Sequence, residues 1–210
     1  MKVAVISIPM RLPEKVGKFQ YSVPLDGNKA IEYPKPILCP INGVLAKTLK
    51  KDEEVKVIYV LTTGKHSSFE QNLINFKDEL EGINAEIGAK LSFDTITIEF
   101  RPEKAMFNKI LTELADKIPD DAEIFADITF GNKPAIVSLL CAIKFAEEFR
   151  DAVIQYVVYG KIEFHDEDDK KTGPVIFDIT SLYYLFNLMG SLRASDAESA
   201  SKKLKDFFAL

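Results

Sequence analysis

The chain has 210 residues, of which 47% are hydrophobic and 28% charged, and its formal net charge is −5. This length suits one domain with a sizeable core, or one domain with an appendage. An acidic chain is a poor candidate for wrapping duplex nucleic acid, which usually needs a basic face, although a local basic pocket can still hold a small anion. No apolar run approaches 18 residues and no cleavable signal precedes the first strand pattern, so we expect a cytoplasmic protein with no membrane partner.

Apolar runs and helical patterns alternate over the first three quarters of the chain. Buried strands are predicted at residues 3–8, 55–61, 95–100, 124–128 and 152–159. Helices are predicted between them at residues 41–51, 67–80, 102–117 and 135–149. Ser67 and Glu70 have the spacing of a capping box at the start of the second of these helices. Strands that alternate with helices are typical of an α/β fold with a mainly parallel, helix-covered sheet.

The pattern changes after about residue 160. Residues 161–164 and 175–179 predict the arms of a β-hairpin, and 182–192 and 195–210 predict helices. The hairpin tip holds His165 and several acidic residues, but their spacing matches no metal-ligand pattern, so we predict a charged turn and no metal. We therefore divide the chain into a core domain, 1–160, and a C-terminal appendage, 161–210, made of the hairpin and helices.

The most informative segment joins the fourth strand to the helix after it. Within residues 127–134, Gly131 lets the backbone bend toward a ligand, and Pro134 suits the first helical position. Lys133 adds a full charge beside the unpaired N–H groups of the first helical turn. The other candidate ligand-binding residues of this turn are Thr129, Phe130 and Asn132. Such a turn can hold phosphate at the carboxyl edge of a sheet, although an ordinary solvated turn shows the same pattern.

A long loop, residues 9–40, follows the first strand and contains six prolines, so no long helix fits it. Loops of this length in compact domains tend to be functional. Its candidate ligand-binding residues are Pro9, Met10, Arg11, Lys18, Gln20 and Tyr21. Thr62 and Thr63 follow the second strand and are candidates for the same sheet edge. Alternatively, the long loop is simply solvated, and Thr62 and Thr63 are residues that cap a helix.

Several enzyme classes find no support in the sequence. It has no Walker motif, no Gly-x-Gly-x-x-Gly and no Gly-x-Ser-x-Gly elbow, and its two histidines are isolated. These patterns weigh against a nucleoside triphosphatase, a dinucleotide enzyme and a hydrolase triad, and we predict no cofactor. Cys39 and Cys141 follow no metal spacing, and Cys141 is expected to be buried on an apolar helix face.

Four segments together resemble the CARF domains of type III CRISPR systems. They are Asp127-Ile-Thr-Phe-Gly-Asn-Lys-Pro134, Phe145-Ala-Glu-Glu-Phe149, Val157-Val-Tyr-Gly160 and Phe177-Asp-Ile-Thr180-Ser-Leu-Tyr-Tyr-Leu185. The resemblance implies a Rossmann-like homodimer that binds a cyclic oligoadenylate, either tetra- or hexa-adenylate, across a two-fold axis. Lys133 and the turn N–H groups would hold phosphates, and residues 9–21 would cover the adenines. The protein would be an antiviral sensor, with its effector in the same longer chain or in a separate chain.

Two other functions stay open, and a third is disfavoured. The same site could belong to a metal-independent ring nuclease, in which the 2′-hydroxyl of the ring attacks the adjacent phosphate and Lys133 stabilises the charge. A small-metabolite Rossmann enzyme is another alternative. A transcriptional regulator is disfavoured, because the basic tail around Lys202, Lys203 and Lys205 lacks the second helix of a helix-turn-helix.

Overall fold

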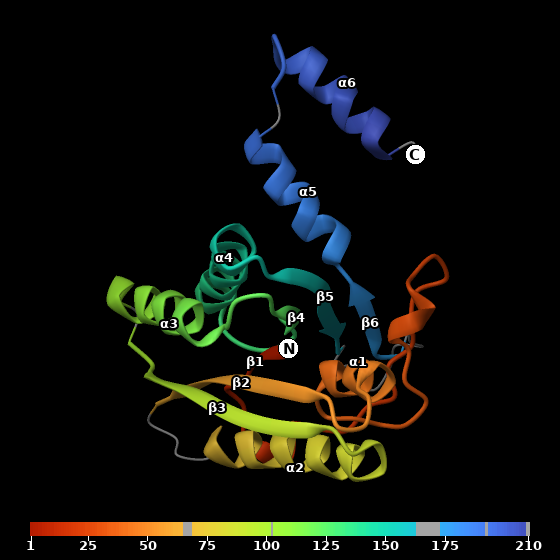
Figure 1. Ribbon diagram of the computed structural model, residues 1–210, viewed down its shortest axis with the longest axis vertical. Coiled ribbons are helices and arrows are strands. Elements are labelled where there is room, and N and C mark those ends of the chain that lie inside the picture. The colour runs from red at the N-terminus through yellow and green to blue at the C-terminus, as the bar shows by residue number, and fades with distance from the viewer. Residues whose placement is uncertain (65–68, 102, 163–172, 192, 209–210) are drawn as a thin grey trace, which may run out of the picture. The chain divides into compact units, whose positions relative to one another are not determined.

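The computed structural model describes residues 1–64, 69–101, 103–162, 173–191 and 193–208 (Figure 1). The chain divides into two compact units, Met1–Ile179 and Thr180–Leu210. Among the described residues, the first unit contains the sheet and four α-helices, and the second contains two. The boundary that we predicted near residue 160 would detach the last strand, whereas in the structure that strand belongs to the sheet of the first unit.

One six-stranded sheet organises the first unit, in the order β3-β2-β1-β4-β5-β6. The strands are β1 (Lys2–Ser7), β2 (Glu54–Thr63), β3 (Lys90–Glu99), β4 (Glu123–Asp127), β5 (Val153–Lys161) and β6 (Val175–Asp178). The first five are parallel, and β6 runs antiparallel to β5. This mixed, mostly parallel sheet is Rossmann-like and confirms the predicted fold class. The strand order reverses between β1 and β4, where open α/β sheets bind their ligands.

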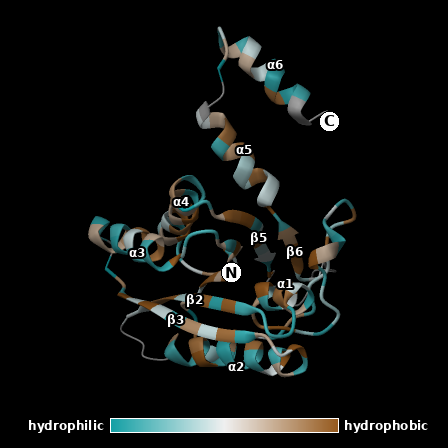
Figure 2. Ribbon diagram, viewed as in Figure 1, coloured by the Kyte–Doolittle hydropathy of each residue, from teal (hydrophilic) through white to brown (hydrophobic). Residues whose placement is uncertain are grey.

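Helices cover both faces of the sheet. Figure 1 shows α1 (Pro40–Thr48) and α2 (Phe69–Ile87) on one face, and α3 (Lys104–Lys117) and α4 (Lys133–Phe149) on the other. Because both faces are covered, β1 is buried along its whole length, as a central parallel strand should be. Apolar and polar residues alternate along α2 in Figure 2, as expected for a helix with one face against the sheet. In the described parts of the chain, no helix is long and apolar enough to cross a membrane.

The second unit consists of α5 (Thr180–Ser191) and α6 (Ala197–Phe208). Several large apolar side chains of α5 are exposed. The predicted helices of the appendage are therefore present, with α5 beginning two residues earlier than predicted. Residues 209–210, the end of the predicted second helix, lie outside the described residues.

The third predicted strand starts too late, because β3 begins at Lys90 rather than near residue 95. Its first half carries charges, which obscure a strand pattern. The Asp94 carboxylate accepts two 2.8 Å hydrogen bonds from Lys117 Nζ on α3 and lies 3.7 Å from Lys56 Nζ on β2. These lysines lower the pKa of Asp94 through hydrogen bonding and charge. Asp94 can therefore lie in an edge strand, because the lysines that pair with its carboxylate are on α3 and β2.

The predicted hairpin also differs in its first arm. Residue 161 is the end of β5, which itself pairs with β6 through Tyr159↔Phe177 and Lys161↔Val175. The tip with His165 lies outside the described residues, as do the predicted cap residue Ser67 and the predicted helix start at residue 102.

The prediction for Cys141 is wrong, because this cysteine is exposed. Helix α4 buries the face that contains Ala135, Ser138, Leu139, Ala142, Ile143 and Ala146. Cys141 lies on the opposite face, so the apolar character of the helix alone did not reveal which side packs inward.

A long irregular segment between β1 and α1, which we call the strap (residues 9–39), runs along the carboxyl edge of the sheet and down to β6. It contains only the short 3₁₀ turns Pro13–Lys15 and Lys29–Ile31. Phe19 and Ile37 exchange two backbone hydrogen bonds of 2.9 Å within it. Ser22 N–H donates to the carbonyl of Pro174 at 3.0 Å, and Ile176 N–H donates to the carbonyl of Ser22 at 2.9 Å. The strap therefore pairs with the outer edge of β6.

Candidate functional site

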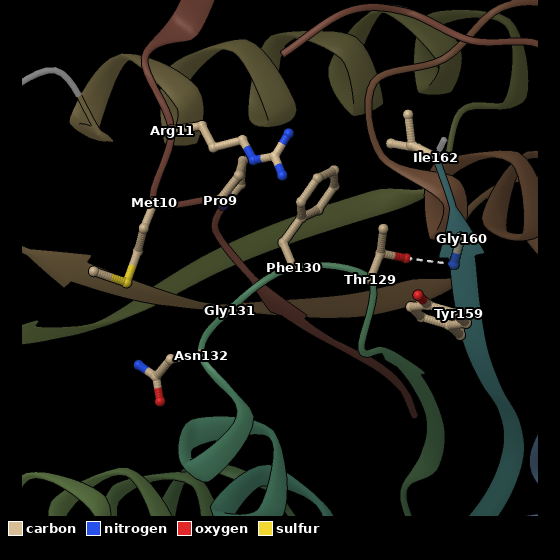
Figure 3. Close-up of a pocket in the computed structure, with 10 residues that line it drawn as sticks. All are labelled: Pro9, Met10, Arg11, Thr129, Phe130, Gly131, Asn132, Tyr159, Gly160 and Ile162. Carbon is tan, nitrogen blue, oxygen red and sulfur yellow. Dashed lines mark hydrogen bonds between the residues drawn. The ribbon is translucent and has the colours of Figure 1, made fainter. Parts of the chain in front are cut away.

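A cavity of about 380 Å³ lies where the start of the strap, the β4–α4 turn and the end of β5 meet. Figure 3 shows the residues that line it: Pro9, Met10, Arg11, Thr129, Phe130, Gly131, Asn132, Tyr159, Gly160 and Ile162. They lie after β1 and β4 and at the end of β5, at the carboxyl edge and beside the point where the strand order reverses. The cavity thus occupies the usual ligand position of an open α/β sheet.

Asp127, the last residue of β4, fixes the start of the turn. One carboxylate oxygen accepts a 2.8 Å hydrogen bond from Thr129 N–H, and the other accepts from Ile41 N–H at 3.0 Å. The Cys39 thiol donates to the same second oxygen over 3.6 Å. The side chain is completely buried, and this burial raises the pKa of Asp127 even though its hydrogen bonds favour the carboxylate. The buried Asp127 carboxylate therefore joins the β4–α4 turn to the first turn of α1.

Thr129 connects the turn to β5. Its Oγ1 accepts a 2.8 Å hydrogen bond from Gly160 N–H, drawn as the dashed line in Figure 3. A Cβ atom at position 160 would lie 2.7 Å from Pro40 Cγ and 3.1 Å from Thr129 Oγ1. Position 160 therefore needs glycine for the strand and the turn to approach this closely.

Gly131 and Asn132 shape the end of the turn. Gly131 has φ = +106°, a conformation that side chains rarely adopt, and a Cβ atom there would collide with Ser7 Oγ. Asn132 caps α4, because its Oδ1 accepts a 2.9 Å hydrogen bond from Ala135 N–H. Lys133 is the first residue of α4 and is exposed. The turn thus presents the amino end of a helix to the cavity, with a lysine beside it.

Helix α2 supports the side of the cavity that is formed by the start of the strap and by Phe130. The fully buried Asn72 donates through Nδ2 to the carbonyl oxygens of Pro9, at 3.0 Å, and Arg11, at 2.7 Å. The ring of Phe130 packs against Phe76 with centroids 5.7 Å apart. In Figure 3 the Arg11 side chain extends toward Phe130 and the cavity. Asn72 was not predicted from the sequence, although a lone amide on the apolar face of a helix was the available signal.

The structure brings seven of the predicted ligand-binding residues together: Pro9, Met10, Arg11, Thr129, Phe130, Gly131 and Asn132. Lys133 follows Asn132 directly but is not among the residues that line the cavity. Gln20 is exposed on the strap and Tyr21 is buried beneath it. Thr62 is buried in β2, and the Thr63 hydroxyl donates to the carbonyl of Ile98 at 3.2 Å, so neither lines the cavity.

Lys18 lies at a different place, beside α2. Its Nζ is 3.5 Å from a carboxylate oxygen of Glu79, whose side chain is only 5% exposed. Glu79 also accepts hydrogen bonds from Leu38 N–H at 2.8 Å, Cys39 N–H at 3.1 Å and the Asn42 amide at 3.0 Å. This acid holds the end of the strap against α2, and Lys18 contributes to that anchor.

The ligand-binding residues predicted from the sequence did not include those at the end of β5. Tyr159, Gly160 and Ile162 line it, and Tyr159 is 39% exposed. The Tyr159 ring stacks on Phe177 of β6, with centroids 6.2 Å apart and planes 19° apart. A tyrosine and a glycine at the end of an apolar strand were the signal in the sequence.

The lining suits binding of an anionic, aromatic molecule. A guanidinium and a helix N-terminus supply positive potential on one side, and the rings of Phe130 and Tyr159 supply flat apolar surface. Within the part of the chain that the structure describes, the lining residues include no histidine, cysteine or acid. The geometry thus provides charge and stacking rather than an acid–base pair.

Comparisons of this chain with known proteins find matches among solved structures. No protein-family model and no curated protein matches it. Among solved structures, it aligns with Enterococcus italicus Csm6 bound to cyclic hexa-2′-fluoro-hexa-dAMP, at a TM-score of 0.39 and 15% sequence identity. The alignment covers 93% of this chain and 41% of the Csm6 chain.

Proposed function

We propose that this chain binds a cyclic oligoadenylate in the cavity between β1, β4 and β5. The proposal rests mainly on one observation: Arg11, the amino end of α4 and the Tyr159 ring all border the same cavity. Cations and helix N–H groups bind phosphate, and aromatic rings stack on bases. The resemblance of residues 127–134 and 157–160 to CARF domains narrows the ligand to a ring of adenosines.

The size of the cavity supports a shared ligand. Its volume of about 380 Å³ is at the low end of the range for small-molecule pockets, roughly 300–1,000 Å³. A ring of four or six nucleotides needs more room than one such cavity offers. Two copies related by a two-fold axis would supply two identical half-sites for a symmetric ring. We therefore propose a homodimeric sensor that signals to an effector in the same longer chain or in a separate one.

Removing either basic residue near the cavity should weaken binding. We expect Arg11→Ala and Lys133→Ala each to cost about 1–3 kcal/mol of binding free energy, because each removes a charge-assisted phosphate contact. Titration calorimetry with cyclic tetra-adenylate and cyclic hexa-adenylate measures the effect. Lys90→Ala is the matched control, since Lys90 is an exposed lysine at the amino end of β3. If the wild-type protein binds neither ring, the proposed function is wrong.

The Tyr159 ring at the cavity allows ligand binding to be followed by fluorescence. The chain has no tryptophan, so Tyr159→Trp introduces a single tryptophan at the cavity, whose emission can be excited separately from that of the tyrosines. We expect its emission to be quenched by the cyclic adenylate, because an adenine stacks on the ring, while Tyr159→Ala should lose about 1–3 kcal/mol of binding. Val153→Trp, at an exposed position at the amino end of β5, is the control and should not respond through stacking. If the Tyr159→Trp protein still binds the ring but its emission is not quenched, the adenine lies elsewhere.

A further inference from the structure

One buried amide interrupts the apolar face of α2. Asn72, Phe76 and Leu80 follow one another by four residues, so they lie on one side of the helix, and all three are fully buried. Phe69, about one turn earlier on the same side, is also buried. Burying an amide among apolar residues is unfavourable unless hydrogen bonds replace those that it makes with water. The presence of Asn72 on this face is therefore best explained by the hydrogen bonds that it forms.

The Asn72 amide donates two hydrogen bonds to the start of the strap. Its Nδ2 lies 3.0 Å from the carbonyl oxygen of Pro9 and 2.7 Å from the carbonyl oxygen of Arg11. The Oδ1 atom of the same amide is buried and has no hydrogen-bond partner among the described residues. A buried acceptor without a partner lowers stability, so this amide is not arranged to give the greatest stability. Its two donors are what distinguish Asn72 from an apolar residue at this position.

These two hydrogen bonds fix the backbone of residues 9–11, all of which line the cavity. Just before them, the Ile8 N–H donates to the carbonyl of Val60 at 2.9 Å, so the backbone contacts with the sheet extend to Ile8. The contacts with Asn72 begin at the next residue. Arg11 is exposed, and Figure 3 shows its side chain extending from this piece of backbone toward the cavity. A shift of the backbone at position 11 would move the guanidinium with it.

We propose that Asn72 is a positioning residue for ligand binding: it contacts no ligand, but it fixes the start of the strap so that Arg11 faces the cavity. For the ligand, this role rests on the proposed function; for the position of Arg11, it rests on the two hydrogen bonds alone. One turn after Asn72, Phe76 packs against Phe130 of the β4–α4 turn. Helix α2 thus supports two sides of the cavity, although none of its residues, Phe69–Ile87, is among those that line it.

A second asparagine of α2 provides a matched control. The Asn84 amide donates to the carbonyl of Ala89 at 2.8 Å and accepts from the Ala89 N–H at 3.0 Å. Ala89 directly precedes β3, so this contact lies at the amino edge of the sheet, whereas the cavity lies at the carboxyl edge. Asn72→Ala and Asn84→Ala each remove two hydrogen bonds between a side chain and the backbone, and both should lower the urea midpoint. Only Asn72→Ala should affect the cavity.

Calorimetric titration with cyclic tetra-adenylate and cyclic hexa-adenylate tests the role in binding. We expect Asn72→Ala to weaken binding about fivefold or more, and Asn84→Ala to change it less than about twofold. In the Arg11→Ala background, Asn72→Ala should change affinity less than about twofold, because no guanidinium is left to position. Equal weakening with and without Arg11, or an unchanged affinity of Asn72→Ala, would overturn the inference. Asn72→Leu, which suits the apolar face but lacks the donors, replaces Asn72→Ala if the alanine variant does not fold.

Hydrogen exchange without ligand separates this inference from the proposed function. We expect the amides of residues 10–12 to exchange about tenfold faster in Asn72→Leu than in the wild type, and at the wild-type rate in Asn84→Ala. Unchanged exchange in Asn72→Leu would show that Asn72 does not fix the strap. Faster exchange in a protein whose wild type binds neither ring would leave Asn72 as the residue that holds the strap and would reject the proposed function.

Discussion

Alanine at position 127 is expected to lower the free energy of unfolding by about 2–4 kcal/mol. The Asp127 carboxylate accepts hydrogen bonds from the N–H groups of Thr129 and Ile41, and each would be left buried without a partner, at about 1–3 kcal/mol per group. The loss is reduced by the removal of a buried charge. Urea denaturation followed by circular dichroism measures it. A change below about 0.5 kcal/mol, as is usual for surface substitutions, would show that the carboxylate does not hold the turn to α1.

The variant Asp127→Asn keeps the shape of the side chain but removes its charge, so it separates the two contributions to stability. Asparagine keeps one acceptor oxygen but cannot serve both N–H groups, so we expect its stability to fall between those of the wild type and the alanine variant. The order wild type, asparagine, alanine is the expected result. Equal stabilities for the two variants would mean that the remaining oxygen contributes nothing.

The wild type and Asp127→Asn should also show a pH dependence of known sign. Burial raises the pKa of Asp127, so folding disfavours its ionised form. The contribution of this group to stability is therefore fullest below the ordinary aspartate pKa of about 3.9 and is lost as pH rises through the raised folded value. We expect the stability advantage of the wild type over Asp127→Asn to shrink as pH increases above about 4. An advantage that grows with pH would contradict the direction of the shift.

Gly131→Ala is expected to have the second large effect, on stability and on binding together. The backbone at φ = +106° alone costs a residue with a side chain about 1–3 kcal/mol, and the added methyl group also meets Ser7 Oγ. The turn must therefore shift, and with it the amino end of α4. We expect a lower urea midpoint and at least tenfold weaker binding of the cyclic adenylate.

A second glycine provides the control for this prediction. A Cβ atom at Gly82, within α2, meets nothing within 4 Å. Gly82→Ala should raise stability by about 0.5–1 kcal/mol, because alanine is the better helix former. If both substitutions stabilise the protein, the strained conformation at position 131 is not required.

Local patterns were sufficient to predict the sheet and the turn. The continuous apolar runs of β1, β2 and β4 and the strand–turn–helix signal around Gly131 depend on neighbouring residues alone, and the structure contains them. Pro9, Met10 and Arg11 could also be placed near this turn, because parallel strands end at one edge of the sheet. These features follow from short-range stereochemistry and from the parallel topology.

What the sequence did not reveal depends on partners far along the chain. Lys18 was a candidate ligand, yet it lies beside Glu79, a distant acid whose burial no local pattern indicates. Asn72 supports the cavity only because the strap folds back over α2. The start of β3 was missed because the partners of Asp94 are on other elements. Long-range polar pairing was therefore the main source of error.

The strap fastens the cavity to the last strand of the sheet. One end is tied to α2 through Asn72, and the other reaches β6 through Ser22 and through Asn28, whose amide donates to Asp178 at 2.7 Å. Asp178 lies two residues before the first residue of α5. The strap thus joins the lining of the cavity, at Pro9 and Arg11, to the strand that precedes α5, so a displacement at one end would have to be accommodated by the hydrogen bonds at the other.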